Sequence, residues 1–145
     1  MPDGIRLTAD EMRYIALFES MTGATAKDCL IDNDLNKIIF VTKEKEAGLA
    51  VGRNGSKVKM LRKMTGRNIE IIEYADNIQE FIKNAFIPAR VKEIRVAERL
   101  DHRKIAVVKV DERDKGLAIG RGGERADRVR QLAKRYFQID NIIIA

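Results

Sequence analysis

The sequence predicts an α+β protein made of two small consecutive domains. Each domain has the expected order helix, strand, strand, short helix, GxxG loop, helix, strand. Three observations support this prediction. A stretch that begins at Lys37 is repeated from Lys104, and each copy contains a GxxG motif, in which Gly120 follows Gly52 by 68 residues. Helix-like and strand-like apolar patterns surround each motif in the same order. A chain of 145 residues has room for two such domains.

The first predicted domain covers residues 1–75. Thr8 and Glu11 have the spacing of a capping box at the start of a helix, and Gly23 is a natural helix end. The elements predicted after this helix are strands over 29–31 and 38–42, a short helix over 45–51, the loop 52–55, a helix over 56–65 and a strand over 69–72. Gly66 follows the helix predicted over 56–65 and is expected to end it.

The second predicted domain covers residues 76–145. Asp76 and Gln79 indicate the start of a helix, whose apolar residues between Ile78 and Phe86 share one face. Pro88 is expected to end this helix. The elements predicted after it are strands over 91–97 and 104–110, a short helix over 112–119, the loop 120–123, a helix over 124–137 and a strand over 142–144. Residues 74–76 at the junction contain no flexible linker pattern.

The two GxxG loops are the candidate binding sites. They consist of Gly52, Arg53, Asn54 and Gly55, and of Gly120, Arg121, Gly122 and Gly123. Glycine permits positive φ angles and lets another backbone come close. The helix that follows each loop offers free N–H groups and the positive end of its dipole, which together suit a phosphate group. An arginine inside each loop adds a positive charge.

The helix after each loop carries further basic side chains. Six basic residues and no acidic residue lie between positions 53 and 67, whereas six basic residues between 121 and 135 are accompanied by Glu124 and Asp127. The candidate contacts on these helices are Lys57, Lys59, Arg62, Arg125 and Arg128. Apolar residues at 49–51 and 117–119 precede the loops, and they either pack inward or form the floor of a groove for bases.

Composition favours a nucleic-acid partner and excludes several kinds of site. The net charge is +6, with 12 basic and 11 acidic residues in 1–75 and 16 and 11 in 76–145. Cys29 is the only cysteine and His102 the only histidine, so cysteine- or histidine-based metal clusters are excluded. No nucleophile–base set can be assembled. We therefore expect no enzyme activity, no cofactor, no metal and no small-molecule substrate.

The chain shows no membrane signal. No apolar run approaches the roughly 18 residues needed for a membrane span. The first residues, 1–4, do not have the pattern of a signal peptide. We therefore expect a cytoplasmic protein without a membrane partner.

The segments Gly-Leu-Ala-Val-Gly-Arg-Asn-Gly and Gly-Leu-Ala-Ile-Gly-Arg-Gly-Gly resemble the core of KH domains. The element order resembles the type II arrangement. The close tandem resembles the KH region of the NusA transcription termination factors, especially the short archaeal NusA-like proteins. The resemblance covers about residues 8–144. It implies that single-stranded RNA lies across each loop, with about four nucleotides held per domain.

The resemblance also implies a role in transcription termination, antitermination or elongation control. The polymerase-binding region, S1 domain and acidic repeats of bacterial NusA have no counterpart in this sequence. Whether RNA polymerase is a partner is therefore left open by the sequence. Two alternatives remain: a ribosome-associated or RNA-processing KH protein, and a protein–protein adaptor with degenerate KH domains. The adaptor predicts weak, salt-insensitive RNA binding, and the retained Arg53 and Arg121 argue against it.

Overall fold

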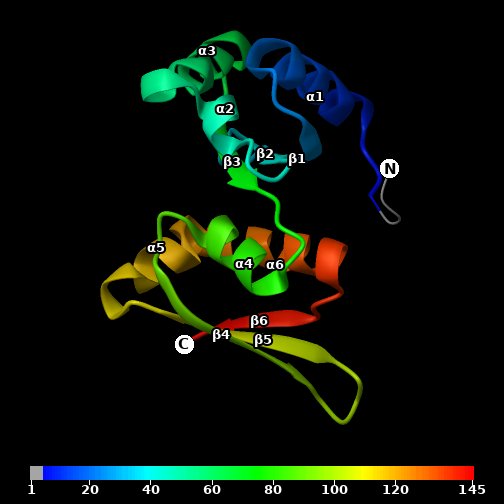
Figure 1. Ribbon diagram of the computed structural model, residues 1–145, viewed down its shortest axis with the longest axis vertical. Helices are drawn as coiled ribbons and strands as arrows, with labels where there is room; N and C mark the ends of the chain where they lie inside the picture. The colour runs from blue at the N-terminus through cyan, green and yellow to red at the C-terminus, as the bar shows by residue number, and fades with distance from the viewer. Residues whose placement is uncertain (1–4) are drawn as a thin grey trace. The chain divides into compact units, whose positions relative to one another are not determined.

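The computed structural model describes residues 5–145; residues 1–4, in which the sequence lacks a signal-peptide pattern, lie outside the described residues. The chain divides into two compact units, Met1–Ala75 and Asp76–Ala145. Each unit contains a three-stranded sheet with helices (Figure 1). The α+β fold class predicted from the sequence is confirmed.

The first unit contains the predicted elements in the predicted order. They are α1 (Ala9–Thr22), β1 (Ala26–Asp32), β2 (Lys37–Thr42), α2 (Ala47–Val51), the 3-10 turn η1 (Arg53–Gly55), α3 (Ser56–Thr65) and β3 (Asn68–Glu73). The strand order is β1-β2-β3. Strands β1 and β2 are antiparallel, whereas β2 and β3 are parallel. Parallel neighbours need a crossover connection, and α2, the GxxG loop and α3 form it.

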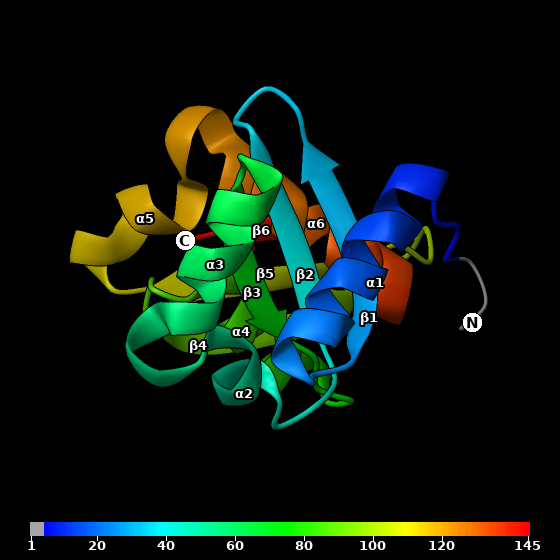
Figure 2. The same ribbon diagram turned by 90° about the horizontal axis from the view of Figure 1, so that it is seen from above.

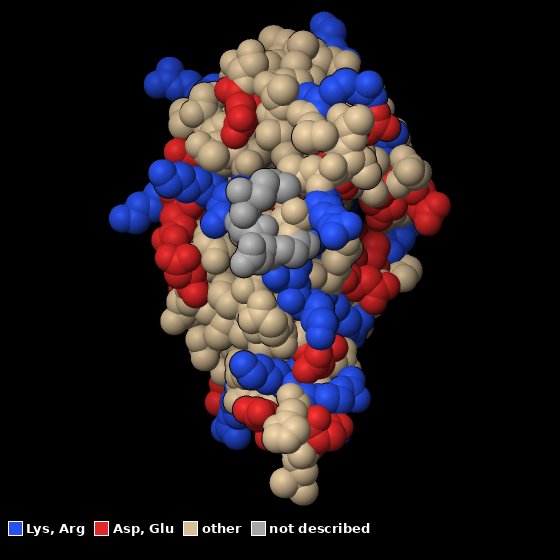
Figure 3. All heavy atoms as spheres, turned by 90° about the vertical axis from the view of Figure 1, so that its right-hand side faces the viewer, with Lys and Arg blue, Asp and Glu red and all other residues tan. Residues whose placement is uncertain are grey.

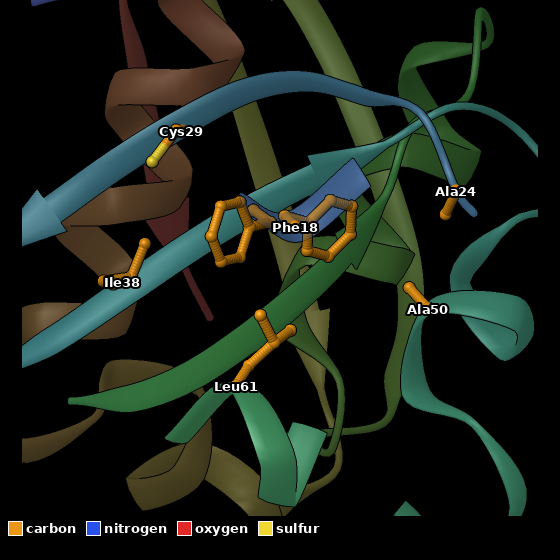
Figure 4. Close-up of a cluster of buried hydrophobic side chains, with 7 residues drawn as sticks. Phe18, Ala24, Cys29, Ile38, Ala50 and Leu61 are labelled. Atoms are coloured by element: carbon orange, nitrogen blue, oxygen red, sulfur yellow. The ribbon is translucent and has the colours of Figure 1, made fainter. Parts of the chain in front are cut away.

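The core of the first unit lies between the sheet and its helices (Figure 4). Phe18 of α1 and Phe40 of β2 are fully buried, and their rings stack with centroids 4.4 Å apart. Cys29 of β1 and Leu61 of α3 belong to the same buried cluster. Figure 2 shows α1 and α3 over the same face of the sheet. Leu61 thereby packs the middle of α3 into the core of the unit.

The ends of α1 follow the predicted chemistry. The Thr8 hydroxyl accepts a hydrogen bond from the Glu11 N–H, and the Glu11 carboxylate accepts one from the Thr8 N–H, at 3.1 and 2.8 Å. Gly23 ends the helix in the left-handed conformation, with φ 74°. The capping box and the glycine stop are therefore confirmed.

The second unit repeats the architecture of the first. Its elements are α4 (Ile78–Phe86), β4 (Val91–Glu98), β5 (Lys104–Val110), the 3-10 turn η2 (Glu112–Asp114), α5 (Lys115–Ile119), the 3-10 turn η3 (Arg121–Gly123), α6 (Glu124–Phe137) and β6 (Asn141–Ile144). The strand order is β4-β5-β6, antiparallel and then parallel. Helices α4 and α6 cover one face of this sheet, and the β4–β5 hairpin extends beyond it (Figure 1).

Two details of the second unit differ from the prediction. The side chain of Asn77, not Asp76, caps α4 by accepting a hydrogen bond from the Glu80 N–H at 3.0 Å. The predicted helix over 112–119 consists of two pieces, η2 and α5, because Asp114 has non-helical dihedral angles, φ −102° and ψ 2°. The fully buried ring of Phe81 in α4 contacts the ring of Tyr136 in α6 edge to face, with the ring centroids 5.3 Å apart.

Among the described residues, no helix is long and apolar enough to cross a membrane. The longest helices, α1 and α6, each have 14 residues.

Candidate nucleic-acid interface

The two GxxG loops have the same backbone conformation. Gly52 has φ 78° and ψ 172°, and Gly120 has φ 79° and ψ 174°. The third residue of each loop is left-handed, with φ 56° at Asn54 and 65° at Gly122. The N–H of the fourth residue donates to the carbonyl of the first in both loops, at 3.1 Å. The sequence repeat is therefore also a repeat of local geometry.

The first glycine of each loop cannot be replaced without a clash. A Cβ on Gly52 would lie 2.8 Å from Cγ of Lys57, and a Cβ on Gly120 would lie 2.8 Å from the backbone nitrogen of Arg125. The dihedral angles of both glycines fall in a region that residues with a side chain almost never occupy. Glycine is therefore required here both for the turn and for the close approach of the following helix.

The N-cap residue of the helix that follows each loop is a glycine, which has no side chain to accept a hydrogen bond. This holds for α3 after Gly55 and for α6 after Gly123. In contrast, Thr8 caps α1 and Asn77 caps α4. The first N–H groups of an α-helix have no partner inside the helix, so α3 and α6 can offer theirs to an anion.

In each unit, a carboxylate at the start of the short helix accepts a hydrogen bond from the residue just before the first strand. The Glu46 carboxylate accepts a hydrogen bond from the Thr25 N–H at 2.6 Å, just before β1. The Asp114 carboxylate accepts one from the Arg90 N–H at 2.9 Å, just before β4. Both bonds hold the entry to a GxxG loop against the sheet.

Four of the predicted basic contacts are exposed. Arg53 and Arg121 lie within the loops, and Lys59 and Arg62 lie along α3. Their charged groups are therefore available on the surface beside the first loop and at the second. This exposure is the property that a contact with a solvated phosphate backbone needs.

Two predicted basic contacts already have structural partners. The Lys57 ammonium donates to the Thr22 carbonyl at the end of α1, at 2.8 Å. The Arg125 guanidinium donates to the Leu117 carbonyl of α5, at 2.7 Å. Each side chain joins the helix after a loop to another helix of the same unit. Their first role is therefore to position the loop.

Arg128 differs from the prediction. Its side chain is 5% exposed and forms an ion pair with Glu124, with the guanidinium nitrogen 2.5 Å from the carboxylate oxygen. It lies on the side of α6 that also buries Val129 and Leu132. The sequence showed a basic helix but did not show which face each charge occupies. We therefore remove Arg128 from the candidate RNA contacts.

Exposed apolar side chains beside the loops were not selected as site residues from the sequence. Ala50 and Ala118 point into the cores and are fully buried. Their neighbours, by contrast, are exposed by 36 to 46%. These neighbours are Leu49, Val51, Leu117 and Ile119. The only sequence signal was the large–small–large order of the apolar residues, which is the same before both loops.

Known proteins share this architecture. A family model described as KH domain matches residues 12–99, and one described as NusA-like second KH domain matches residues 78–145. The probable transcription termination protein NusA of Halococcus morrhuae is 37% identical, covering 97% of this chain and 99% of that protein. The chain belongs to the NusA-like family of KH-domain proteins. The resemblance inferred from the loop segments is thereby confirmed.

Two further comparisons agree with this assignment. The probable transcription termination protein NusA of Halobacterium salinarum is 38% identical to this NusA-like chain, covering 95% of it and 96% of that protein. The crystal structure of APE1850 has 41% sequence identity and a TM-score of 0.80, covering 96% of this chain and all of that one.

The surface of the NusA-like chain is not uniformly basic. Figure 3 shows one face on which basic and acidic side chains are intermingled. Charge density alone therefore does not mark the binding site. The exposed arginines of the two loops differ from other basic side chains in the GxxG backbone beside them. Within residues 5–145, no group of three or more His, Cys, Asp or Glu side chains could hold a metal ion.

Proposed function

We propose that this NusA-like protein binds single-stranded RNA through both GxxG loops and acts in transcription termination. One observation carries the proposal. Two loops with the same backbone conformation each hold an exposed arginine and lead into a helix without a side-chain cap. This combination supplies hydrogen-bond donors, a positive dipole end and an exposed positive charge for a phosphodiester.

The proposed site includes both loops and their supports. Residues 1–75 and 76–145 would each act as one KH domain. The proposed phosphate contacts are Gly52, Arg53, Asn54, Gly55, Lys59, Arg62, Gly120, Arg121, Gly122 and Gly123. Lys57 and Arg125 hold the following helices in place through the carbonyls of Thr22 and Leu117.

The bases would lie on the exposed apolar residues of the short helices. Leu49 and Leu117 occupy the same position in the two units, as do Val51 and Ile119. Phe18, Phe40, Phe81 and Phe86 are fully buried, so their rings are not offered for stacking on bases. Recognition would therefore rest on backbone clamping and aliphatic contact.

The biological role follows from the relatives' names. The similar proteins of Halococcus morrhuae and Halobacterium salinarum are named probable transcription termination proteins. We carry this role over to the present chain, with the transcription machinery as its context and RNA polymerase as a proposed partner. It would act by binding and not by catalysis.

RNA titration at several salt concentrations tests this proposal. Arg53→Asp/Asn54→Asp and Arg121→Asp/Gly122→Asp should each weaken binding to a mixed-sequence single strand. The log–log salt slope should become flatter by about 0.7 for each phosphate that the variant no longer neutralises. Gly122→Asn is the matched control, because the first loop already holds asparagine in this left-handed position.

The alternatives give different results. An adaptor with degenerate KH domains predicts weak binding that neither double variant changes. A ribosome-associated protein predicts intact RNA binding with co-purification of ribosomal subunits in place of RNA polymerase.

A further inference from the structure

The two GxxG loops differ in the acidic residues that follow them. Residues 53–60 contain three basic residues and no acidic residue, whereas residues 121–128 contain three basic and two acidic residues. Position 124, the first residue of α6, is glutamate, and the matching position in α3 is Ser56. Two loops with closely similar backbones therefore present different charges to an approaching anion.

The Glu124 carboxylate lies directly beside the second loop. Its Oε1 is 3.1 Å from the position that a Cβ on Gly120 would occupy. The side chain is 14% exposed, and its ion pair with the buried Arg128 holds it there. At the matching place in the first loop, the Ser56 hydroxyl is 2.9 Å from the Cβ position on Gly52. A hydroxyl can donate a hydrogen bond to a phosphate, whereas a carboxylate has no proton to donate and repels it.

We infer that the first loop is the main phosphate clamp and that Glu124 weakens phosphate binding at the second. This inference rests on the proposed function and concerns how the two loops share it. A carboxylate in the first turn of α6 interacts favourably with the same helix dipole that would attract a phosphate. It therefore competes with the ligand for the positive end of the helix. Arg128 pairs with one carboxylate oxygen, Oε2, at 2.5 Å, whereas Oε1 is the oxygen beside the Gly120 backbone.

Reciprocal substitutions test the inference. Glu124→Gln keeps an oxygen that can accept from Arg128 but removes the charge, and it should raise RNA affinity. Ser56→Glu places the carboxylate in the first loop and should lower affinity. We expect a change of about two- to five-fold in each case, the range for one charge at a helix terminus. Glu80→Gln removes a charge from the first turn of α4, which follows no GxxG loop, and should change nothing.

The Glu124→Gln change is measured both in the intact chain and in the Arg53→Asp/Asn54→Asp background, where binding depends on the second loop. Thermal unfolding of each variant verifies the fold. Glu124→Gln could destabilise the chain by leaving Arg128 without a charge partner. In that case the effect of a carboxylate at this position is judged from Ser56→Glu, because Ser56 lies in the other unit and its substitution leaves Arg128 paired.

The outcomes separate this inference from the proposed function. Support requires that the first-loop double variant loses more affinity than the second-loop variant and that the substitutions shift affinity in opposite directions. Equal losses at both loops, with no effect of Glu124→Gln or Ser56→Glu, would overturn the inference but leave RNA binding in place. No loss at either loop would overturn the proposed function itself.

Discussion

The Asp114 carboxylate accepts hydrogen bonds from both the backbone and the side chain of Arg90. One carboxylate oxygen accepts from the Arg90 N–H and from its Nε, each at 2.9 Å, and the other accepts from Nη2 at 3.4 Å. This contact joins the residue before β4 to the start of α5, which leads into the second loop. It therefore couples the sheet to the position of the GxxG backbone.

Replacing Asp114 should displace the second loop while the unit stays folded. Asp114→Ala removes the acceptor for the Arg90 N–H, so α5 loses its attachment to the start of β4. We expect a melting temperature lowered by several degrees and a loss of RNA affinity comparable to that of the second-loop double variant. Calorimetry and RNA titration measure the two effects. Intact affinity in a folded Asp114→Ala variant would contradict the positioning role, and Asp101→Ala in the β4–β5 hairpin is the control.

Stability should depend on pH through Asp114. The hydrogen bond from the Arg90 side chain, with a second from its backbone, holds the pKa of Asp114 below its usual value. A lowered pKa in the folded state stabilises the protein above the usual aspartate pKa of about 4, and this stabilisation is lost as pH falls through the lower folded value. Melting temperature should therefore fall with acidification more steeply in the wild type than in Asp114→Asn. Parallel curves for the two proteins would show that Asp114 does not contribute.

Gly120→Ala should destabilise the second unit. The new Cβ would clash with the Arg125 backbone nitrogen, in a region of dihedral angles that costs about 1–3 kcal/mol. Denaturant unfolding measures the change. Gly116→Ala is the matched control, because it lies within α5 with no atom near its Cβ position and should be neutral or slightly stabilising. Equal stability of both variants would mean that the loop relaxes around the methyl group.

The apolar residues beside the second loop should contribute to RNA affinity and little to stability. Leu117→Ser/Ile119→Ser should weaken RNA binding about five-fold, as expected when about 1 kcal/mol of apolar burial is removed. Both side chains are exposed, so the free energy of unfolding should change by less than about 0.5 kcal/mol for each. Ile87→Ser, at an exposed site between α4 and β4, is the control. Unchanged RNA affinity would exclude these residues from the base groove.

Cys29 should not react with alkylating reagents in the folded protein. Burial raises the pKa of its thiol to about 12, with the carboxylates of Glu11 and Asp28 adding to the effect. Almost no thiolate is present at pH 8, and the reactive species is the thiolate. Mass spectrometry after iodoacetamide treatment should show modification only in denaturant. Rapid labelling under native conditions would indicate local opening of the sheet around β1.

The sequence predicts the elements well where local signals are strong. The predicted bounds of α3 and α6 agree with the structure, because glycines with positive φ mark where both helices begin and Gly66 marks where α3 ends. The cap of α4 was misplaced by one residue, since Asp76 and Asn77 are both good cap residues. Local sequence does not decide between two adjacent caps.

The candidate site was predictable only in part. The loops and their arginines follow from motif and repeat. The roles of Lys57, Arg125 and Arg128 depend on contacts with other elements or on which face of a helix is buried. A basic residue on a helix can bind a ligand, hold a neighbouring helix or pair with an acid. Composition does not distinguish these roles, whereas the i,i+4 spacing of Glu124 and Arg128 was a signal for the third.

The glycine N-caps of α3 and α6 link the proposed ligand to the stability of the protein. A serine, threonine or aspartate at the N-cap accepts a hydrogen bond from the helix, whereas Gly55 and Gly123, the N-caps of α3 and α6, have no side chain to do so. Under the proposed function, RNA phosphates bind these helix ends, so RNA should protect the protein against unfolding increasingly as its concentration rises.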